Sequence, residues 1–174
     1  YLSELREFLR DDQIMIGRED RSVYGHDGTA LLHGMPECVV LPETVDQVAR
    51  LLKLATFHEV PVVTRGSGTG LSGGSVPSPG SIVVSLVRMN RILEVDRENL
   101  TMTVEPGVLT QDVFDTAVEA GLFYPPDPGS IKISTIGGNV ANNSGGLRGL
   151  KYGVTRNYVM ALQVVMADGQ ILET

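Results

Sequence analysis

The chain is poor in several kinds of residue, and each shortage excludes a class of protein. Its single cysteine, Cys38, excludes an internal disulfide framework and a cysteine-rich zinc site. The three histidines lack the spacing of metal ligands, so we expect no metal site. No apolar run approaches the roughly 18 residues that a membrane-spanning helix needs. The net charge of −7 argues against general nucleic-acid binding.

Glycine, by contrast, is abundant, and its placement is uneven. The chain has 20 glycines in 174 residues, and twelve of them lie in residues 66–80 and 137–153. Both stretches fall inside windows without Asp or Glu, residues 60–93 and 128–167, which together carry seven lysines and arginines. Glycine-rich segments that lack acids and carry basic residues indicate a bound anion.

The order of apolar and polar segments predicts an α+β fold with two lobes. Residues 1–88 contain a strand, a helix and a strand in succession, which is a βαβ unit with a small parallel sheet. Residues 89–174 predict a mainly antiparallel lobe with helices, which looks incomplete at its C-terminal end. The expected elements are a helix over 2–10, an irregular stretch over 17–36, a strand over 38–41, a helix over 45–58, strands over 61–64 and 81–87, a hairpin over 91–105, a helix over 110–120 that stops at Gly121, and a hairpin over 161–173 around Asp168-Gly169.

The first glycine-rich segment follows the strand over 61–64 and reads RGSGTGLSGGS from Arg65 to Ser75. Three of its glycines match the dinucleotide fingerprint G-x-G-x-x-G, but the two prolines in residues 74–80 cannot start the helix that this motif requires. The prolines therefore argue against a nicotinamide Rossmann site, and a P-loop is excluded because no Gly-Lys-Ser/Thr follows. What remains is a turn whose backbone N–H groups converge on phosphate oxygens, or a plain surface loop. We favour the ligand loop, because it lacks the Asp, Asn, Glu and Lys of a solvated one.

The second segment combines a stiff turn over 125–130 with TIGGNVANNSGG over 135–146. Its small residues allow the backbone to approach a flat ligand, and the amides of Asn139, Asn142 and Asn143 suit a heteroaromatic ring edge or a ribose. If residues 138–143 form a short helix, the start of that helix is a further anion site. The alternative is a tight crossing in which small residues serve packing alone.

These motifs, in this order and spacing, resemble a known family. Residues 65–75, 126–130, 135–139 and 142–146 are similar to the FAD-binding domain of flavoproteins of the p-cresol methylhydroxylase and vanillyl-alcohol oxidase type (PCMH type). Within it, the FAD-binding subunit of glycolate oxidase and the D-2-hydroxyacid (D-lactate) dehydrogenases are the most similar group. The resemblance extends from about residue 24 to the end of the sequence.

The resemblance implies two sets of FAD-binding residues. The set at the pyrophosphate is Arg65, Gly66, Ser67, Gly68, Thr69, Gly70, Gly73, Gly74 and Ser75. The set at the ribityl chain and the isoalloxazine ring is Pro128, Gly129, Ser130, Thr135, Gly137, Gly138, Asn139, Asn142, Ser144, Gly145, Tyr152 and Gly153. Some relatives link a histidine of the first loop covalently to the flavin. Near Thr69 this sequence has none, so the resemblance implies non-covalent FAD, and His26 is expected to be structural.

The resemblance also implies an activity, the oxidation of a small 2-hydroxy acid such as glycolate or D-lactate by hydride transfer to FAD. The alternatives are an oxidase of another alcohol or of an aldonolactone on the same domain, and a non-catalytic nucleotide-binding module. We assign no catalytic residue, because the relatives carry the substrate groups in a later cap domain, and we expect this chain alone to be inactive. An electron-transfer subunit, a quinone or a cytochrome is the expected acceptor. A cytoplasmic location is expected, either free or held at the inner face of the membrane by partners.

Overall fold

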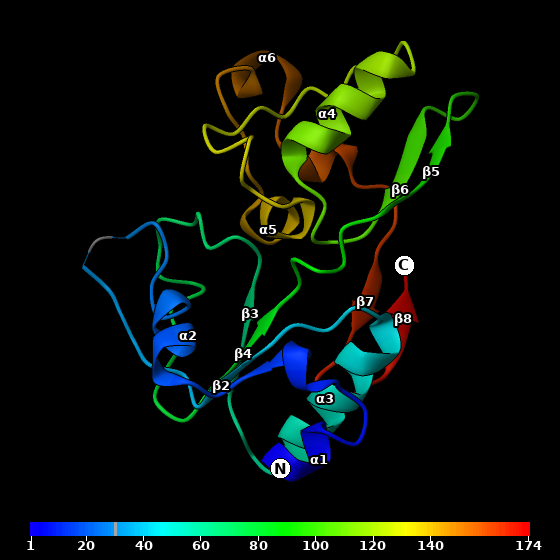
Figure 1. Cartoon of the computed structure of the whole chain (residues 1–174). Coiled ribbons are helices and arrows are strands. Elements are labelled where there is room, and N and C mark those ends of the chain that lie inside the picture. The colour runs from blue at the N-terminus through cyan, green and yellow to red at the C-terminus, as the bar shows by residue number, and fades with distance from the viewer. Residues whose placement is uncertain (30) are drawn as a thin grey trace. The chain divides into compact units, whose positions relative to one another are not determined.

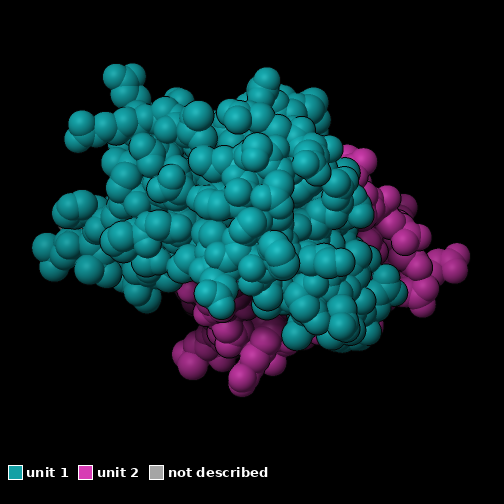
Figure 2. All heavy atoms as spheres, turned by 90° about the horizontal axis from the view of Figure 1, so that it is seen from below, with its two compact units in different colours: residues 1–88, 161–174 teal, residues 89–160 magenta. Residues whose placement is uncertain are grey.

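The computed structural model describes residues 1–29 and 31–174, which form two compact units. One unit contains residues 1–88 together with 161–174, and the other contains residues 89–160 (Figure 2). The sequence places residues 161–174 in the second lobe, whereas their contacts in the structure are with the first unit. Each unit is described by itself below.

The first unit contains a four-stranded sheet in the order β1-β2-β4-β3. Strands β2 (Cys38–Val40) and β3 (Val62–Arg65) both pair in parallel with β4 (Ile82–Ser85), and the three lie side by side in Figure 1. The short β1 (Ile14–Met15) pairs antiparallel with β2. Every residue of β2 and β4 is buried, as in a sheet covered on both faces. The parallel sheet predicted from the βαβ pattern is confirmed.

Helix α3 (Val45–Phe57) covers one face of this sheet, and its start is fixed by Thr44, whose hydroxyl accepts the Gln47 N–H at 3.2 Å. Leu51 and Ala55 on its inner face join a core that also contains Leu5 and Val84. The core excludes water from the sheet and gives this half of the chain its stability.

Two N-terminal expectations are corrected by the structure. The helix expected over residues 2–10 is regular only in α1 (Leu2–Leu5), and a 3₁₀ turn follows at Asp11–Gln13. The stretch over 17–36 contains the helix α2 (Arg18–Val23), while residue 30 lies outside the described residues. Helix α2 buries none of its residues, so it has no apolar periodicity by which the sequence could reveal it.

The hairpin of β7 (Gln163–Val165) and β8 (Ile171–Glu173) packs against α3. The Thr56 hydroxyl donates to the Ala167 carbonyl at 2.5 Å, and Gly169 adopts φ +83° in the turn. A Cβ at Gly169 would lie 2.6 Å from the Ala49 carbonyl oxygen, so glycine is required by both conformation and space. The predicted Asp168-Gly169 turn is confirmed.

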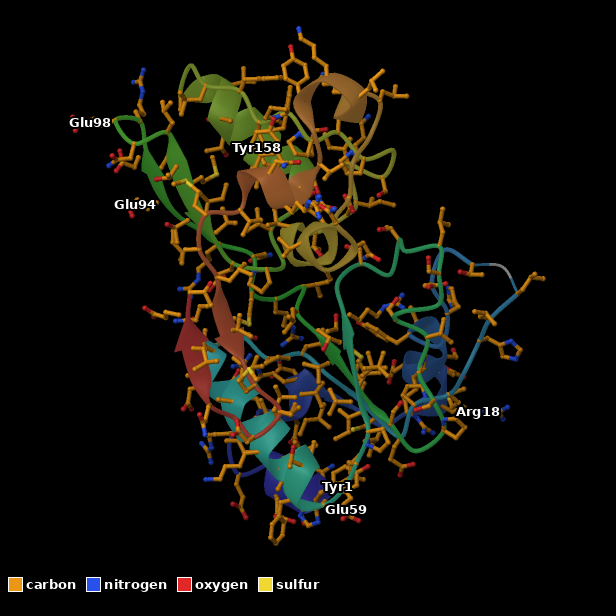
Figure 3. The ribbon with its side chains drawn as sticks, turned by 180° about the vertical axis from the view of Figure 1, so that it is seen from behind. Tyr1, Arg18, Glu59, Glu94, Glu98 and Tyr158 are labelled. Atoms are coloured by element: carbon orange, nitrogen blue, oxygen red, sulfur yellow. The ribbon has the colours of Figure 1, made fainter. Side chains whose placement is uncertain are left out.

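The second unit contains the antiparallel hairpin of β5 (Ile92–Asp96) and β6 (Thr101–Val104), on which the exposed Glu94 and Glu98 are labelled in Figure 3. Gly121, with φ +75°, follows the end of helix α4 (Thr110–Glu119) and confirms the predicted end of that helix. Together with the parallel sheet of the first unit, these elements confirm the predicted α+β class. The helices of this unit are α4 (Thr110–Glu119), α5 (Ile136–Asn142), α6 (Gly149–Tyr152) and the 3₁₀ turn Thr155–Tyr158, which carries the labelled Tyr158.

Candidate cofactor site

The glycine loop, residues 65–75, begins at the carboxyl end of β3 and lies beside the carboxyl end of β4. In parallel sheets, ligands bind outside the carboxyl ends of the strands. A cleft of about 290 Å³ lies there, within the first unit. Its lining consists of Val23, Tyr24, Arg65, Gly66, Ser67, Ser85 and Val87.

Ser85 supplies a polar atom that the protein itself does not use. The residue is fully buried at the end of β4, and its hydroxyl has no hydrogen-bond partner in the described part of the chain. Buried polar groups are nearly always paired, so an unpaired hydroxyl on the wall of a cleft is a candidate ligand contact. The sequence does not single out Ser85, because there it is one residue of an apolar strand.

The Arg65 side chain lies under the loop and is 7% exposed. Its Nη1 donates to the His26 carbonyl at 2.5 Å, and the guanidinium lies 5.6 Å from the centre of the Tyr24 ring. Burial lowers the pKa of Arg65, and the neighbouring Tyr24 and Asp27 oppose this shift. Gly68 crosses directly over the guanidinium with φ +72°, and a Cβ at that position would overlap it.

Asp27 is a second site residue that the sequence did not indicate. Its Oδ1 accepts the Thr29 N–H at 2.8 Å, and its Oδ2 is buried without a partner among the described residues. Burial alone raises the pKa of the Asp27 carboxyl, but the hydrogen bond from Thr29, the nearby Gly73 backbone and the charge of Arg65 lower it overall. The neighbouring Gly28 N–H donates to the Gly70 carbonyl at 2.8 Å. An ionised acid therefore lies behind the loop.

The windows that contain no acid in the sequence are thus not free of acids in space. Arg88 pairs with Asp12 at 2.6 Å in the first unit. In the second unit, Arg91 pairs with Glu105 at 2.7 Å. The acids come from outside the windows and neutralise arginines inside them. The net positive charge inferred from the sequence is therefore a weaker argument for an anion than the shape of the glycine loop.

The open backbone of the loop remains an argument for a ligand. Gly74 has an ordinary φ, and a Cβ built on it would meet no described atom within 4 Å. The same holds for Gly129 in the second unit. Packing gives no reason for glycine at these positions, whereas the close approach of a ligand to the backbone would give one.

The second predicted segment forms the expected short helix, α5, but its start is not an anion site. The Ile136 N–H donates to the Val108 carbonyl at 2.9 Å, and the Gly137 N–H donates to the Pro106 carbonyl at 2.8 Å. The hydroxyl of Thr135 accepts the Gly138 N–H at 3.3 Å. The first N–H groups of the helix are therefore already paired within the unit, and this hypothesis was wrong.

The amide side chains of this segment also bond within the protein. Asn139 is buried, and its Nδ2 donates to the Thr110 hydroxyl at 2.7 Å. The Nδ2 of Asn142 donates to the Gly138 carbonyl at 3.0 Å, and the Oδ1 of Asn143 accepts the Arg156 N–H at 3.0 Å. For these three side chains the structure favours the packing alternative over a ring or ribose contact.

Two parts of the second segment are held together by Asp127. Its Oδ1 accepts the Arg148 N–H at 3.0 Å, and its Oδ2 lies 3.5 Å from the Arg148 Nε. Gly146, with φ +144°, lies so close that a Cβ would overlap the Asp127 carbonyl. The turn that carries Pro128, Gly129 and Ser130 and the loop that carries Ser144 and Gly145 are therefore brought together.

The remaining predicted residues lie at the end of α6. The carbonyl of Tyr152 accepts the Tyr158 hydroxyl at 2.6 Å. Gly153 has φ +84°, and a Cβ there would lie 2.6 Å from the Asn157 Oδ1.

Among the described residues no helix is long and apolar enough to cross a membrane, and His, Cys, Asp and Glu form no cluster suited to a metal ion.

Comparison with known proteins gives a consistent result. The chain is 54% identical over 154 residues to the glycolate oxidase subunit GlcD of Bacillus subtilis (strain 168), covering 88% of this chain and 33% of that protein. It is 41% identical over 162 residues to the D-lactate dehydrogenase of Anaerostipes hadrus, covering 92% of this chain and 34% of that protein. The chain thus spans about a third of the length of these relatives.

Solved structures give the same result. Alkyldihydroxyacetonephosphate synthase has a TM-score of 0.90 and 25% identity, over 99% of this chain and 35% of its own. p-Cresol methylhydroxylase with substrate bound has a TM-score of 0.86 and 25% identity, over 99% of this chain and 34% of its own. The family model described as "FAD binding domain" matches residues 36–174. The chain therefore belongs to the FAD-binding domain family of PCMH-type flavoproteins.

Proposed function

We propose that this chain is the FAD-binding portion of an oxidoreductase that oxidises a small 2-hydroxy acid of the glycolate or D-lactate type. The observation that carries the substrate class is the 54% identity to a glycolate oxidase subunit. Two further relatives support this substrate class, a D-lactate dehydrogenase at 41% identity and a D-2-hydroxyglutarate dehydrogenase at 36% identity. The compounds after which they are named, D-lactate and D-2-hydroxyglutarate, are both 2-hydroxy acids. When bound, FAD supplies a hydride acceptor for the carbon that carries the hydroxyl.

The residues of the first unit fit the pyrophosphate of FAD. The glycine loop lies at the carboxyl end of two parallel strands, and its open backbone at Gly74 can donate N–H groups without side chains in the way. The hydroxyls of Ser67 and Ser85 line the same cleft. We assign the pyrophosphate to this loop, with Ser85 added to the residues that the sequence indicates.

In the second unit we assign the flavin end of the cofactor to backbone rather than to amide side chains. Gly129 is open, and Asp127 joins the turn that carries Ser130 to the loop that carries Gly145, so we assign the flavin end to the surface of this turn and loop. Thr135 and Asn139 support that surface from inside the unit, because their side chains are already bonded there. The proposed attachment is non-covalent, since residues 65–75 contain no histidine.

We assign no catalytic base to this chain. A further domain would supply the clamp for the substrate carboxylate and the group that takes the hydroxyl proton. An electron-transfer subunit, a quinone or a cytochrome would reoxidise the enzyme, which would lie in the cytoplasm or, through such partners, at the inner face of the membrane. The relative from Bacillus subtilis is a subunit of glycolate oxidase, which supports a partner protein.

The test uses the protein with its complete reading frame. Purified natively, it should contain FAD that denaturation releases completely, and it should reduce an artificial electron acceptor with glycolate or D-lactate. Activity only with a phenol, or formation of an alkylated dihydroxyacetone phosphate, would favour the second candidate, the same domain acting on another substrate. That candidate is supported by the likeness to p-cresol methylhydroxylase and the alkyldihydroxyacetonephosphate synthase. A protein without flavin would overturn both.

A further inference from the structure

We propose that Arg65 is a positioning residue for FAD, which acts through Gly68 rather than by touching the cofactor. In this proposal the buried guanidinium is the support over which the glycine loop turns, so that the loop keeps the shape that binds the pyrophosphate. The proposal rests on the proposed function of the glycine loop and adds to it the residue that sets its shape.

The first observation is the fit between Arg65 and Gly68. Gly68 has φ +72°, a conformation that favours glycine, and the positions that a Cβ would take are filled by the guanidinium group. The loop backbone and the guanidinium therefore leave no room for a side chain at this point. A side chain at residue 68 would have to displace either the loop backbone or the guanidinium.

The second observation is that the guanidinium is held from behind. The Arg65 Nη1 donates to the His26 carbonyl, and the ring of Tyr24 lies beside the guanidinium. Asp27 contributes the opposite charge, because the hydrogen bond from Thr29 and the charge of Arg65 lower the pKa of its carboxyl against the effect of burial. A buried guanidinium is costly unless paired, and here its partners fix it in one position.

The third observation is a backbone hydrogen bond between residues 24–28 and the glycine loop. The Gly28 N–H donates to the Gly70 carbonyl at 2.8 Å. Residues 24–28 thus contact the loop directly at Gly70 and indirectly, through Arg65, at Gly68. These two points lie on either side of Thr69, so the segment defines the course of the middle of the loop.

A double-mutant cycle tests the proposal. The variants are Arg65→Ala, Gly68→Ala and the double variant, made in the protein with its complete reading frame and stripped of FAD. The dissociation constants of FAD and of ADP are measured by titration. In the wild-type background we expect Gly68→Ala to weaken FAD binding by at least about 100-fold, since strain and overlap add. In the Arg65→Ala background the same change should cost at most about 30-fold, because only the left-handed strain remains.

Two further variants separate the support from a direct charge contact. Arg65→Lys keeps the charge but loses the flat group under Gly68, so it should weaken FAD binding as much as Arg65→Ala does. Gly80→Ala is the matched control, because Gly80 has φ +76° and a Cβ there meets no described atom within 4 Å. It reports the cost of the strained backbone on thermal stability and should leave FAD affinity unchanged.

Equal losses from Gly68→Ala in both backgrounds would overturn the proposal, as would full FAD affinity in Arg65→Lys with a large loss in Arg65→Ala. If Gly68→Ala does not fold, the double variant decides. A double variant that folds and binds FAD supports the proposal. A double variant that neither folds nor binds FAD, although Arg65→Ala folds, overturns it. A wild-type protein that binds neither FAD nor ADP would instead contradict the proposed function.

Discussion

Asn139 on α5 donates a 2.7 Å hydrogen bond to the hydroxyl of Thr110 at the start of α4, inside the second unit. The same hydroxyl lies 2.9 Å from the Ser134 hydroxyl, and all three residues are buried. The amide that the sequence suggests for a ligand is thus part of a buried polar network centred on the Thr110 hydroxyl. Such networks stabilise the fold when every polar group is paired and destabilise it when one partner is missing.

We therefore predict that Asn139→Ala lowers the free energy of unfolding by about 2–3 kcal/mol, since it leaves a cavity and removes one buried hydrogen bond to the Thr110 hydroxyl. Denaturant unfolding of the variant measures this. Asn142→Ala is the control, because that side chain is exposed and bonds only to its own helix. Its expected loss is within about 0.5 kcal/mol. Equal losses in the two variants would contradict the structural role of Asn139.

Asp127 gives a second prediction, on the turn and loop that it joins. Asp127→Ala removes the acceptor of the Arg148 N–H and the partner of its Nε, and should cost about 1–3 kcal/mol of stability. Asp127→Asn keeps one oxygen for the N–H group and should cost less. Thermal unfolding compares the two variants. A loss as large in Asp127→Asn would show that the ion pair, rather than the backbone bond, holds the loop.

The sequence predicted the fold better than it predicted the roles of single side chains. Strands β2, β3 and β4 follow from continuous apolar runs, and the stops at Gly121 and Gly169 follow from the need of glycine for positive φ. Helix α2 was not predicted, because it has no buried apolar face. These outcomes depend on local pattern, which a single sequence contains.

The site depended on contacts that a single sequence does not contain. Asp27 and Arg65 are far apart in the sequence, and only the fold brings the carboxylate behind the loop. The pairing of Arg88 with Asp12 likewise cancels a charge that the acid-free window appeared to leave uncompensated. Charge counted along a chain therefore predicts the field at a site poorly, because partners come from other elements.

Glu105 gives a prediction on pH. It is 8% exposed and accepts bonds from Arg91 at the backbone N–H, at 2.8 Å, and at Nη2, at 2.7 Å. Hydrogen bonding to the Arg91 side chain lowers the pKa of Glu105, while partial burial opposes this. A carboxylate with a lowered folded pKa stabilises the fold above its unfolded pKa, and this contribution is lost as the pH falls through the folded pKa.

We therefore expect wild-type protein to lose more stability than Glu105→Gln as the pH is lowered from neutral through the range where carboxylates titrate. Thermal midpoints at a series of pH values measure the difference. Glu94→Gln, an exposed change on the same hairpin, controls for the loss of one negative charge. Parallel curves for the wild type and Glu105→Gln would show that the Arg91 pair contributes nothing to folding.

The last prediction concerns the serine that the sequence did not single out. Ser85→Ala removes a hydroxyl that has no partner within the described residues, so we expect stability to be unchanged or slightly higher. If the hydroxyl contacts the cofactor, the dissociation constant of FAD should rise about 5–10-fold, which is the usual contribution of one neutral hydrogen bond. Ser81→Ala, at the residue before β4, is the matched control, since the Ser81 hydroxyl donates to the Ser78 carbonyl at 2.7 Å. It should lower stability and leave FAD affinity unchanged, so the two serines should show opposite effects. If Ser85→Ala binds FAD as tightly as the wild type, the hydroxyl does not contact the cofactor, and the cleft is assigned to the loop backbone alone.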